Sequence, residues 1–393
     1  MQSLPSPAPG YKRVCVRCAA PFGTGIIMPQ AALALALTVF LLFLVAQFYP
    51  VAGIEMAGQS HAARIATDAS MLADRAFSSL GLLVFGLVIA APFMRVTALT
   101  WIFACLRWHH TPPYLTQMFR ISEILRPWAM LDVLLLGIIV SNSKLRDLAQ
   151  VNMQTGFWAL GLAVLAIFAM EAAFDRHALW DALKPPPVFS RPPEAKAWIS
   201  CHVCSWLQSD KKESHCARCG AAVHHRKRAS LSQTWALVIA ALILYIPANI
   251  YPVLITTTMG QRTSSTIIGG VRQLINGNDW PLAVILFTAS IIIPLLKLFG
   301  FMWLMISVHY HHADHLMFRT RLYRFIYVIG RWSNTDIFVG ASLTGLVTLG
   351  SIANVVPDIG GIAFAAVVAL TMLAAETFDP RLIWDNAENS HGK

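Results

Sequence analysis

Four cysteines near the middle of the chain have the spacing of a metal site. Cys201 and Cys204 form one Cys-x2-Cys pair, and Cys216 and Cys219 form a second pair after an interval of 11 residues. Four thiolates presented by two tight turns are a tetrahedral ligand set for Zn²⁺. Because a closed four-sulfur site leaves no open position for a substrate, the spacing predicts a structural zinc ribbon. A rubredoxin-like iron site or a redox role is the alternative.

A single further pair, Cys15 and Cys18, lies near the start of the chain. Cys18 precedes Tyr49 by 31 residues and Cys219 precedes Tyr251 by 32, so the early pair corresponds to the second pair of the ribbon. Two ligands cannot close a zinc site. We therefore interpret this pair as a degenerate ribbon, unless nearby histidines or a partner chain supply the missing ligands.

Two cations lie inside strongly apolar segments, where a charge is costly and by default marks a functional site. Lys297 is about 12 residues from the end of its apolar run, or roughly 18 Å along a helix, which places it near the middle of a bilayer. Pro294 precedes it by three residues and predicts a kinked or broken helix. Arg95 and Pro92 repeat the arrangement earlier in the chain.

Polar residues also form a stripe in a later apolar segment, where they recur every four residues and therefore share one helix face. We expect this stripe and the cations to form a site that binds a lipid headgroup or carries a proton coupled to transport. Its residues are Lys297, Asp336, Ser290, Ser333, Thr344 and Thr348, with Arg95 and Asp132 as counterparts in the first half. The alternative is an internal ion pair and helix–helix hydrogen bonds that hold the helices together.

The chain that carries these residues is unusually apolar. Of its 393 residues, 56% are hydrophobic and 13% are charged, whereas soluble domains have about 45–50% and about 25%. This composition argues against a soluble enzyme. Apolar runs of about 20 residues can cross a bilayer as helices, so we predict an all-α polytopic membrane protein. The eight predicted spans are 31–51, 79–106, 128–143, 156–174, 234–253, 281–308, 333–350 and 360–378.

Basic residues are unevenly distributed around these spans. With the N-terminus inside, the inside segments carry 22 Lys and Arg residues and the outside loops carry six. Cytoplasmic loops of membrane proteins are enriched in Lys and Arg. The distribution therefore predicts that both termini are cytoplasmic. It also attributes most of the formal net charge of +10 to membrane topology, so no nucleic-acid partner is expected.

The sequence contains a tandem repeat. The tripeptide Tyr-Pro-Val at Tyr49 recurs at Tyr251, and Arg95 corresponds to Lys297 at the same offset of 202 residues. Four spans in each half return the chain to the side on which it started, so the two repeats are parallel. The predicted domains are a cytoplasmic segment with the degenerate ribbon (1–30), the first four-helix repeat (31–180), a linker and cytoplasmic ribbon (181–232), the second repeat (233–385) and a tail (386–393).

The sequence shows no motif of an enzyme. It lacks the phosphate loop Gly-x4-Gly-Lys-[Ser/Thr], the zinc-protease motif His-Glu-x-x-His and the nucleophile motif Gly-x-Ser-x-Gly. We therefore expect neither ATP hydrolysis nor another catalytic activity. The predicted outside loops are too short to form a domain that reaches across a cell envelope, so transport between two membranes would require a partner.

The sequence resembles the PqiA/LetA family, also called paraquat-inducible protein A. The resemblance extends from Cys15 to Asp385 and rests on the double Cys-x2-Cys ribbon, the Tyr-Pro-Val helix ends, and three segments that begin at Ile293, Ile329 and Phe378. It implies an inner-membrane protein of Gram-negative bacteria that moves phospholipids between membranes. It also implies a periplasmic MCE-domain tunnel protein, of the LetB or PqiB kind, as partner. The incomplete first ribbon is the main departure from the family.

We thus expect an inner-membrane component that loads or unloads lipid at one end of an MCE tunnel. An ion-coupled transporter for a small solute is one alternative, and ion flux without any partner would favour it. A redox- or stress-sensing membrane protein is the other, and reversible cysteine oxidation coupled to an output would favour that.

Overall fold

A computed structural model gives the fold of the chain, with most residues between Met28 and Asp385 described. The described residues are 28–56, 59–65, 78–110, 112–145, 150–185, 198–209, 215–227, 229–258, 261–310, 315–330, 334–346 and 353–385. Within them the structure is mostly helical, as predicted. Cys15 and Cys18 lie outside the described residues.

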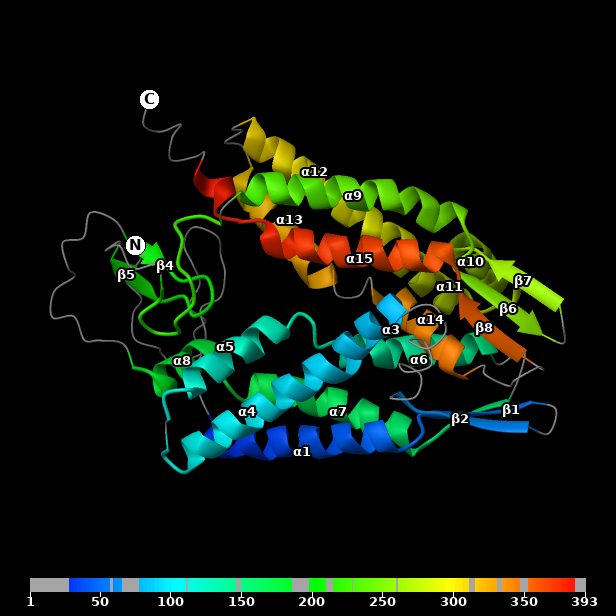
Figure 1. The fold of residues 1–393 in the computed structure, drawn as a ribbon, viewed down its shortest axis with the longest axis horizontal. Coiled ribbons are helices and arrows are strands. Elements are labelled where there is room, and N and C mark those ends of the chain that lie inside the picture. Colours follow the sequence, from blue (N-terminus) through cyan, green and yellow to red (C-terminus); the bar gives the residue numbers. More distant parts are fainter. Residues whose placement is uncertain are drawn as a thin grey trace. The chain divides into compact units, whose positions relative to one another are not determined.

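The first half of the chain is built from long helices, a β-hairpin and one further strand (Figure 1). Its elements are α1 (Pro29–Phe48), β1 (Ala52–Met56), β2 (Gln59–Ala63), α3 (Ser78–Phe85), the π-helical turn η1 (Gly86–Ala90), α4 (Ala91–Arg107), α5 (Leu115–Leu125), α6 (Leu131–Leu145), β3 (Gln150–Met153), α7 (Thr155–Ala172) and α8 (Arg176–Leu183). Strands β4 (Trp198–Ser200) and β5 (Leu207–Ser209) follow in the cysteine-rich segment.

The second half repeats this order of elements. They are α9 (Ser230–Ile250), β6 (Leu254–Thr258), β7 (Gln261–Ser265), α10 (Ile267–Asn276), α11 (Trp280–Phe287), η2 (Thr288–Ile292), α12 (Ile293–His309), α13 (Leu316–Ile329), α14 (Thr335–Leu346), β8 (Ala353–Pro357) and α15 (Ile359–Thr377). Both π-helical turns come directly before a segment that begins with a proline at its second position. The predicted internal repeat is therefore visible in the element order.

Each repeat also contains the same small antiparallel sheet. The strand orders are β2-β1-β3 and β7-β6-β8, so a hairpin is joined by a strand from much later in the repeat. Ala52 lies opposite Met153 in the first sheet, and Leu254 lies opposite Pro357 in the second. These sheets were not predicted from the sequence, and their matching registers are independent support for the repeat.

A glycine after the third strand makes each sheet possible. A Cβ on Gly156 would lie 2.6 Å from the carbonyl oxygen of Tyr49, and a Cβ on Gly360 would lie 2.4 Å from that of Tyr251. The amide of Gly156 instead donates a hydrogen bond to the carbonyl of Pro50, at 2.9 Å. The close approach of the two backbones thus requires a residue without a side chain.

Six of the described helices are long and apolar enough to cross a membrane. They are Pro29–Phe48, Gly86–Arg107, Thr155–Ala172, Ser230–Ile250, Trp280–His309 and Ile359–Thr377. The molecule is accordingly a polytopic membrane protein, and six of the eight predicted spans correspond to these helices.

The predicted third and seventh spans correspond to helices that are shorter, within the described residues, than the other six. They correspond to α6, with 15 residues, and α14, with 12 residues. At 1.5 Å per residue these helices are about 22 Å and about 18 Å long, less than the roughly 30 Å of the hydrocarbon core. In the first half, Pro127 follows the end of α5 and cannot donate the backbone hydrogen bond that would extend it. Hydropathy alone does not reveal such an interruption.

The predicted breaks at Pro92 and Pro294 are absent, because each helix continues through a wider turn. The π-helical turns η1 and η2 occupy the residues just before the two prolines. A proline has no amide hydrogen and its ring presses on the preceding turn, and a π-bulge accommodates this without breaking the helix. The structure thus corrects the expectation of a broken helix beside Lys297.

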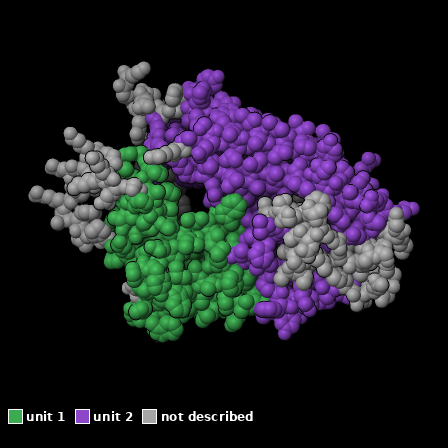
Figure 2. Space-filling model, viewed as in Figure 1, with its two compact units in different colours: residues 1–44, 91–129, 161–225 green, residues 45–90, 130–160, 226–393 purple. Residues whose placement is uncertain are grey.

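The chain divides into two compact units (Figure 2). The first contains residues 1–44, 91–129 and 161–225, and the second contains residues 45–90, 130–160 and 226–393. In the first, the ribbon cysteines share a core with helices α4, α5 and α8, where the rings of Phe119 and Trp180 lie 4.6 Å apart. In the second, α9 and α15 pack side by side (Figure 1) around a core that includes Phe301 and Phe378.

Candidate metal centre and charged sites in the membrane helices

The four ribbon cysteines converge as a metal site requires. The sulfurs of Cys201, Cys204, Cys216 and Cys219 all lie within 4.8 Å of one another, and all four residues are buried. The Cys201 and Cys219 sulfurs are 3.6 Å apart, as are those of Cys204 and Cys216. Tetrahedral zinc with Zn–S bonds of about 2.3 Å would separate its sulfurs by about 3.8 Å. The geometry fits a four-thiolate metal ion.

Two knuckle turns hold the sulfurs in place. The amide of Cys201 donates to the carbonyl of Trp206 at 2.8 Å, and the amide of Cys216 donates to the carbonyl of Ala221 at 2.7 Å. Gly220 has a φ of +68°, a conformation that glycine adopts without strain. Hydrogen bonding among the four sulfurs lowers the pKa values of Cys201 and Cys216 and raises those of Cys204 and Cys219.

The ribbon is attached to the helices of its own unit. Arg218 forms an ion pair with Asp181 of α8 and lies 5.2 Å above the ring of Trp206. Arg120 of α5 donates to the carbonyl of Cys219 at 3.3 Å, and Lys184 donates to the carbonyl of Ala217 at 2.6 Å. The second knuckle is therefore the part of the ribbon that contacts α5 and α8.

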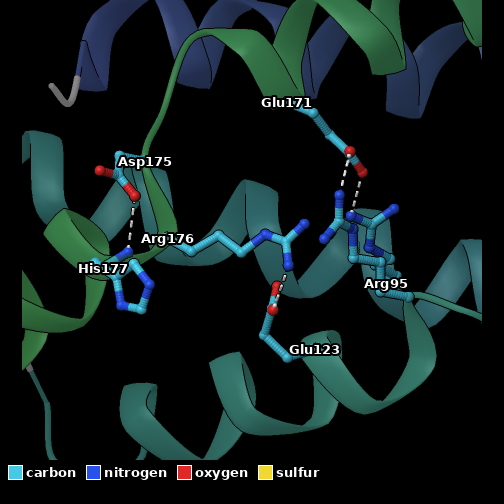
Figure 3. Close-up of polar contacts among 7 residues, drawn as sticks. Arg95, Glu123, Glu171, Asp175, Arg176 and His177 are labelled. Carbon is cyan, nitrogen blue, oxygen red and sulfur yellow. Dashed lines mark hydrogen bonds and ion pairs between the residues drawn. The ribbon is translucent and has the colours of Figure 1, made fainter. Parts of the chain in front are cut away.

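Arg95 belongs to a charged cluster that the sequence did not predict in full. Its Nη2 atom donates to Glu171 of α7 at 2.6 Å, and Arg126 donates to the other oxygen of Glu171 at 2.8 Å (Figure 3). A second ion pair joins Arg176 to Glu123 at 3.4 Å. Burial raises the pKa of Glu123. Asp132, the predicted counterpart of Asp336 in the first half, lies on α6, which belongs to the second unit.

Lys297 has a different environment. Its side chain is 1% exposed, and its ammonium donates to the carbonyl of Gly330 at 2.9 Å and to the hydroxyl of Thr371 at 3.5 Å. Gly330 ends α13, and a cation is stabilised at the C-terminal end of a helix. Among the described side chains, no carboxylate pairs with Lys297. The lysine therefore holds the end of α13 against α15 through neutral acceptors.

The remaining predicted residues are only partly described. Ser333 and Thr348 lie outside the described residues, and of Asp336 only the position at the start of α14 is given. The hydroxyls of Ser290 and Thr344 donate to carbonyls of their own helices, Leu286 at 2.6 Å and Gly340 at 2.8 Å. The assignment of these residues to one polar site with Lys297 therefore stays a prediction.

Sequence reasoning missed three residues of these two sites: two that contact the cations, and one that shares Glu171 with Arg95. They are Glu171, Arg126 and Thr371. Glu171 is the only charged residue of α7, so the search that singled out Arg95 and Lys297 could have found it if it had included carboxylates. Arg126 and Thr371 carry no such signal, because neither type is unusual at its position.

Two hollows lie at corresponding places in the repeats, both within the second unit. The larger holds about 700 Å³, part of it open to the surroundings, and is lined by apolar residues with the hydroxyl residues Ser265, Thr266 and Ser290. The smaller holds about 430 Å³ and is lined by residues that include Val51, Val88 and Ser342. Ala341 of α14 lines both.

A repeated helical membrane architecture with a four-cysteine ribbon defines the class of protein: a polytopic membrane protein with a metal-binding module. The model of the family described as paraquat-inducible protein A (PqiA) matches residues 30–184 and 231–388. The chain therefore belongs to the PqiA family.

Similar proteins come from enteric and related bacteria. Over 400 residues the chain is 32% identical to intermembrane transport protein PqiA of Escherichia coli (strain K12), covering 99% of this chain and 94% of that protein. Over 394 residues it is 29% identical to lipophilic envelope-spanning tunnel protein A of the same strain, covering 100% of this chain and 90% of that protein. A probable intermembrane transport protein of Haemophilus influenzae is 29% identical over 269 residues, covering 66% and 64%. No solved structure matches the chain.

Proposed function

We propose that this protein is the inner-membrane component of an intermembrane lipid transport system, where it loads or unloads phospholipid. The observation that carries the proposal is the pair of apolar hollows beside α14, one in each repeat. Their walls carry no charged side chain among the lining residues, which suits a hydrocarbon chain better than a polar solute. The names of the relatives, which refer to intermembrane transport and an envelope-spanning tunnel, support the same function.

The hollows and Lys297 take different parts of a lipid in this proposal. An acyl chain enters the larger hollow, where the hydroxyl residues Ser265 and Thr266 at its wall can meet the ester region. Lys297, with Asp336, Ser290, Ser333, Thr344 and Thr348, interacts with the headgroup or carries a proton that is coupled to lipid movement. The basic bias of the cytoplasmic loops supports an orientation with both termini in the cytoplasm of a Gram-negative cell.

A periplasmic MCE-domain tunnel protein is the proposed partner. The described strands form two small three-stranded sheets and the two-stranded sheet of the ribbon, so the described part of the chain contains nothing that could cross a periplasm. A separate tunnel would carry the lipid onward, and this protein would have no catalytic role.

The four ribbon cysteines would hold Zn²⁺ in the proposed cytoplasmic domain. Such an ion contributes folding free energy and takes no part in transport chemistry. Its effect would reach the membrane helices through Arg120, Arg218 and Lys184, which join the ribbon to α5 and α8. The divisions proposed for the chain are unchanged: 1–30, 31–180, 181–232, 233–385 and 386–393.

Narrowing the larger hollow tests the function. Gly340→Leu adds a side chain to the wall, and a Cβ at this position meets no atom closer than Leu254 Cδ2 at 3.8 Å. Ala236→Phe adds bulk on an exposed position of α9 and is the matched control. We expect Gly340→Leu to reduce lipid transfer between vesicles and the partner, and the lipid retained on purification, at equal membrane abundance, while the control retains both.

Two results would contradict the proposal. One is normal lipid transfer and normal retained lipid in Gly340→Leu. The other is ion-dependent uptake of a small solute by the protein alone in liposomes, which would assign it to the solute transporters.

A further inference from the structure

Outside the hollows and the ribbon, the first unit contains a charged cluster with more positive than negative charge. Glu171 lies between Arg95 and Arg126 and accepts one hydrogen bond from each. These three side chains carry two positive charges and one negative charge, whereas the neighbouring pair of Arg176 and Glu123 is balanced (Figure 3). The inner triad therefore keeps an excess positive charge in a largely buried place.

One hydrogen-bond donor of the triad, and one hydroxyl on α5, have no acceptor among the described atoms. The Nε atom of Arg95 is buried and has no partner among the described atoms, although the residue is 7% exposed overall. The hydroxyl of Ser122, one helical turn before Arg126 on α5, is likewise buried without a partner. Each guanidinium has five N–H donors, and Arg95 and Arg126 each use one in the described contacts. Unsatisfied buried donors of this kind are costly.

The cluster is open on one side and lies at the edge of a membrane helix. Side-chain exposure is 29% for Arg126 and 26% for Glu171, compared with 8% for Arg95. Glu171 is the last residue but one of the candidate span Thr155–Ala172. Arg95 lies about 12 residues before the end of its own candidate span, Gly86–Arg107, so the triad links the middle of one helix to the end of another. Basic groups between membrane helices near such an end can bind lipid phosphates.

We propose that the guanidinium groups of Arg95 and Arg126 together bind a phosphate group, with Glu171 occupying that place when no phosphate is bound. This inference rests on the proposed function, because it names the part of the lipid that the first unit recognises. A phosphate offers more acceptor oxygens than a carboxylate, and two arginines bind it through paired hydrogen bonds. It would displace Glu171 from the guanidinium groups and accept from the Nε–H of Arg95, which has no partner in its absence.

The arrangement predicts opposite effects for two conservative changes. Arg126→Gln removes a charged donor and should weaken phosphate binding about tenfold or more, since a hydrogen bond to a charged group contributes about 1.5–3 kcal/mol. Glu171→Gln removes the competing negative charge and should tighten binding by about tenfold on the same scale. A purely structural ion pair would give no tighter binding in either variant.

The experiment uses the full-length protein in detergent, with native mass spectrometry as readout. The probes are short-chain phosphatidylglycerol, short-chain phosphatidylethanolamine, diacylglycerol with the same chains, and inorganic phosphate. We expect both phospholipids to bind, diacylglycerol to bind at least tenfold more weakly, and the two variants to shift phospholipid affinity in opposite directions. Arg107→Gln, an exposed arginine on the same helix as Arg95, is the matched control and should not change affinity.

Each other outcome decides against part of the inference. Equal binding of diacylglycerol, or unchanged affinity in Arg126→Gln and Glu171→Gln, overturns the phosphate site. Inorganic phosphate that binds as tightly as the lipids retains the site and overturns the lipid as its source. If Arg126→Gln does not fold, Arg126→Lys keeps the charge without the paired donors and should bind with intermediate affinity.

The two proposals fail in different ways. Phosphate-dependent binding without any lipid transfer would refute the transport function and leave the site in place. If Gly340→Leu reduces lipid transfer as expected but the triad shows no preference for phosphate, the transport function stands and the phosphate site is refuted.

Discussion

The two repeats hold their membrane cations in opposite ways. In the first, Arg95 is paired with Glu171, which also binds Arg126. In the second, Lys297 occupies the corresponding position and is held by the carbonyl of Gly330 and the hydroxyl of Thr371. Later in each repeat the offset is 204 residues, as between Gly156 and Gly360. At this offset Gly330 corresponds to Arg126, and an alanine, Ala375, corresponds to Glu171. One duplicated framework thus carries a charge-paired site and a neutral-partner site.

This difference assigns different tasks to the two halves. Removing one partner from a buried ion pair leaves an uncompensated charge, so the first-half cluster should dominate stability. A lysine with only neutral acceptors loses less when it is replaced, because no opposite charge is left behind. Any role in headgroup or proton binding should therefore be easier to separate from folding at Lys297 than at Arg95.

The largest expected effect comes from the ribbon, which packs against helices of the first half. Chelation of zinc, or Cys216→Ser, should sharply lower the melting temperature of the first unit. Zinc binding in small modules contributes about 10–16 kcal/mol. In hydrogen-exchange measurements, the backbone amides of α5 and α8 should lose protection before those of α9 and α15.

Cys105→Ser is the control for that experiment, because Cys105 is a buried thiol of α4 outside the ribbon. It should leave metal content unchanged. Equal destabilisation of both units by chelation, or a purified protein without zinc that melts normally, would break the proposed asymmetry.

The two cation sites give the next effect. Glu171→Ala should destabilise the protein by about 3–5 kcal/mol, because it leaves Arg95 and Arg126 without their shared carboxylate. Lys297→Met should change stability by less than about 2 kcal/mol, the scale of an unpaired carbonyl, yet reduce lipid transfer at least tenfold. Thermal unfolding in one detergent and a vesicle transfer assay measure both. A Lys297→Met variant that transports normally would remove Lys297 from the proposed site.

The smallest effect compares two glycines. A Cβ on Gly330 would lie 3.2 Å from Cε of Lys297, whereas a Cβ on Gly161 of α7 would meet nothing within 4 Å. Gly161→Ala should stabilise its helix by about 0.5–1 kcal/mol. Gly330→Ala should cost about 1 kcal/mol, because Lys297 must move away. If both substitutions change the free energy of unfolding in the same direction, as measured by thermal unfolding, Gly330 does not make room for the lysine.

The repeated fold and the ribbon were predictable because both leave periodic signals. Matching residues at one offset identify a duplication, and paired Cys-x2-Cys turns identify a metal module. Long apolar runs identified the six long helices for the same reason.

The partners of the cations were less predictable. Lys297 binds a backbone carbonyl 33 residues away. Because every residue has such a carbonyl, the sequence does not indicate which one the lysine will bind. The strands that close each sheet are separated by about 100 residues, and their pairing depends on the helices between them. The π-helical turns replaced the expected breaks because packing around each proline kept the helix continuous.

One small residue links the two hollows. Ala341 forms part of the wall of each, so α14 is a partition between two chambers. A ligand that pushes this partition while filling one chamber reduces the room in the other. By thermodynamic linkage the second ligand must then weaken the first by the same factor. Occupancy of one hollow would therefore lower the affinity of the other.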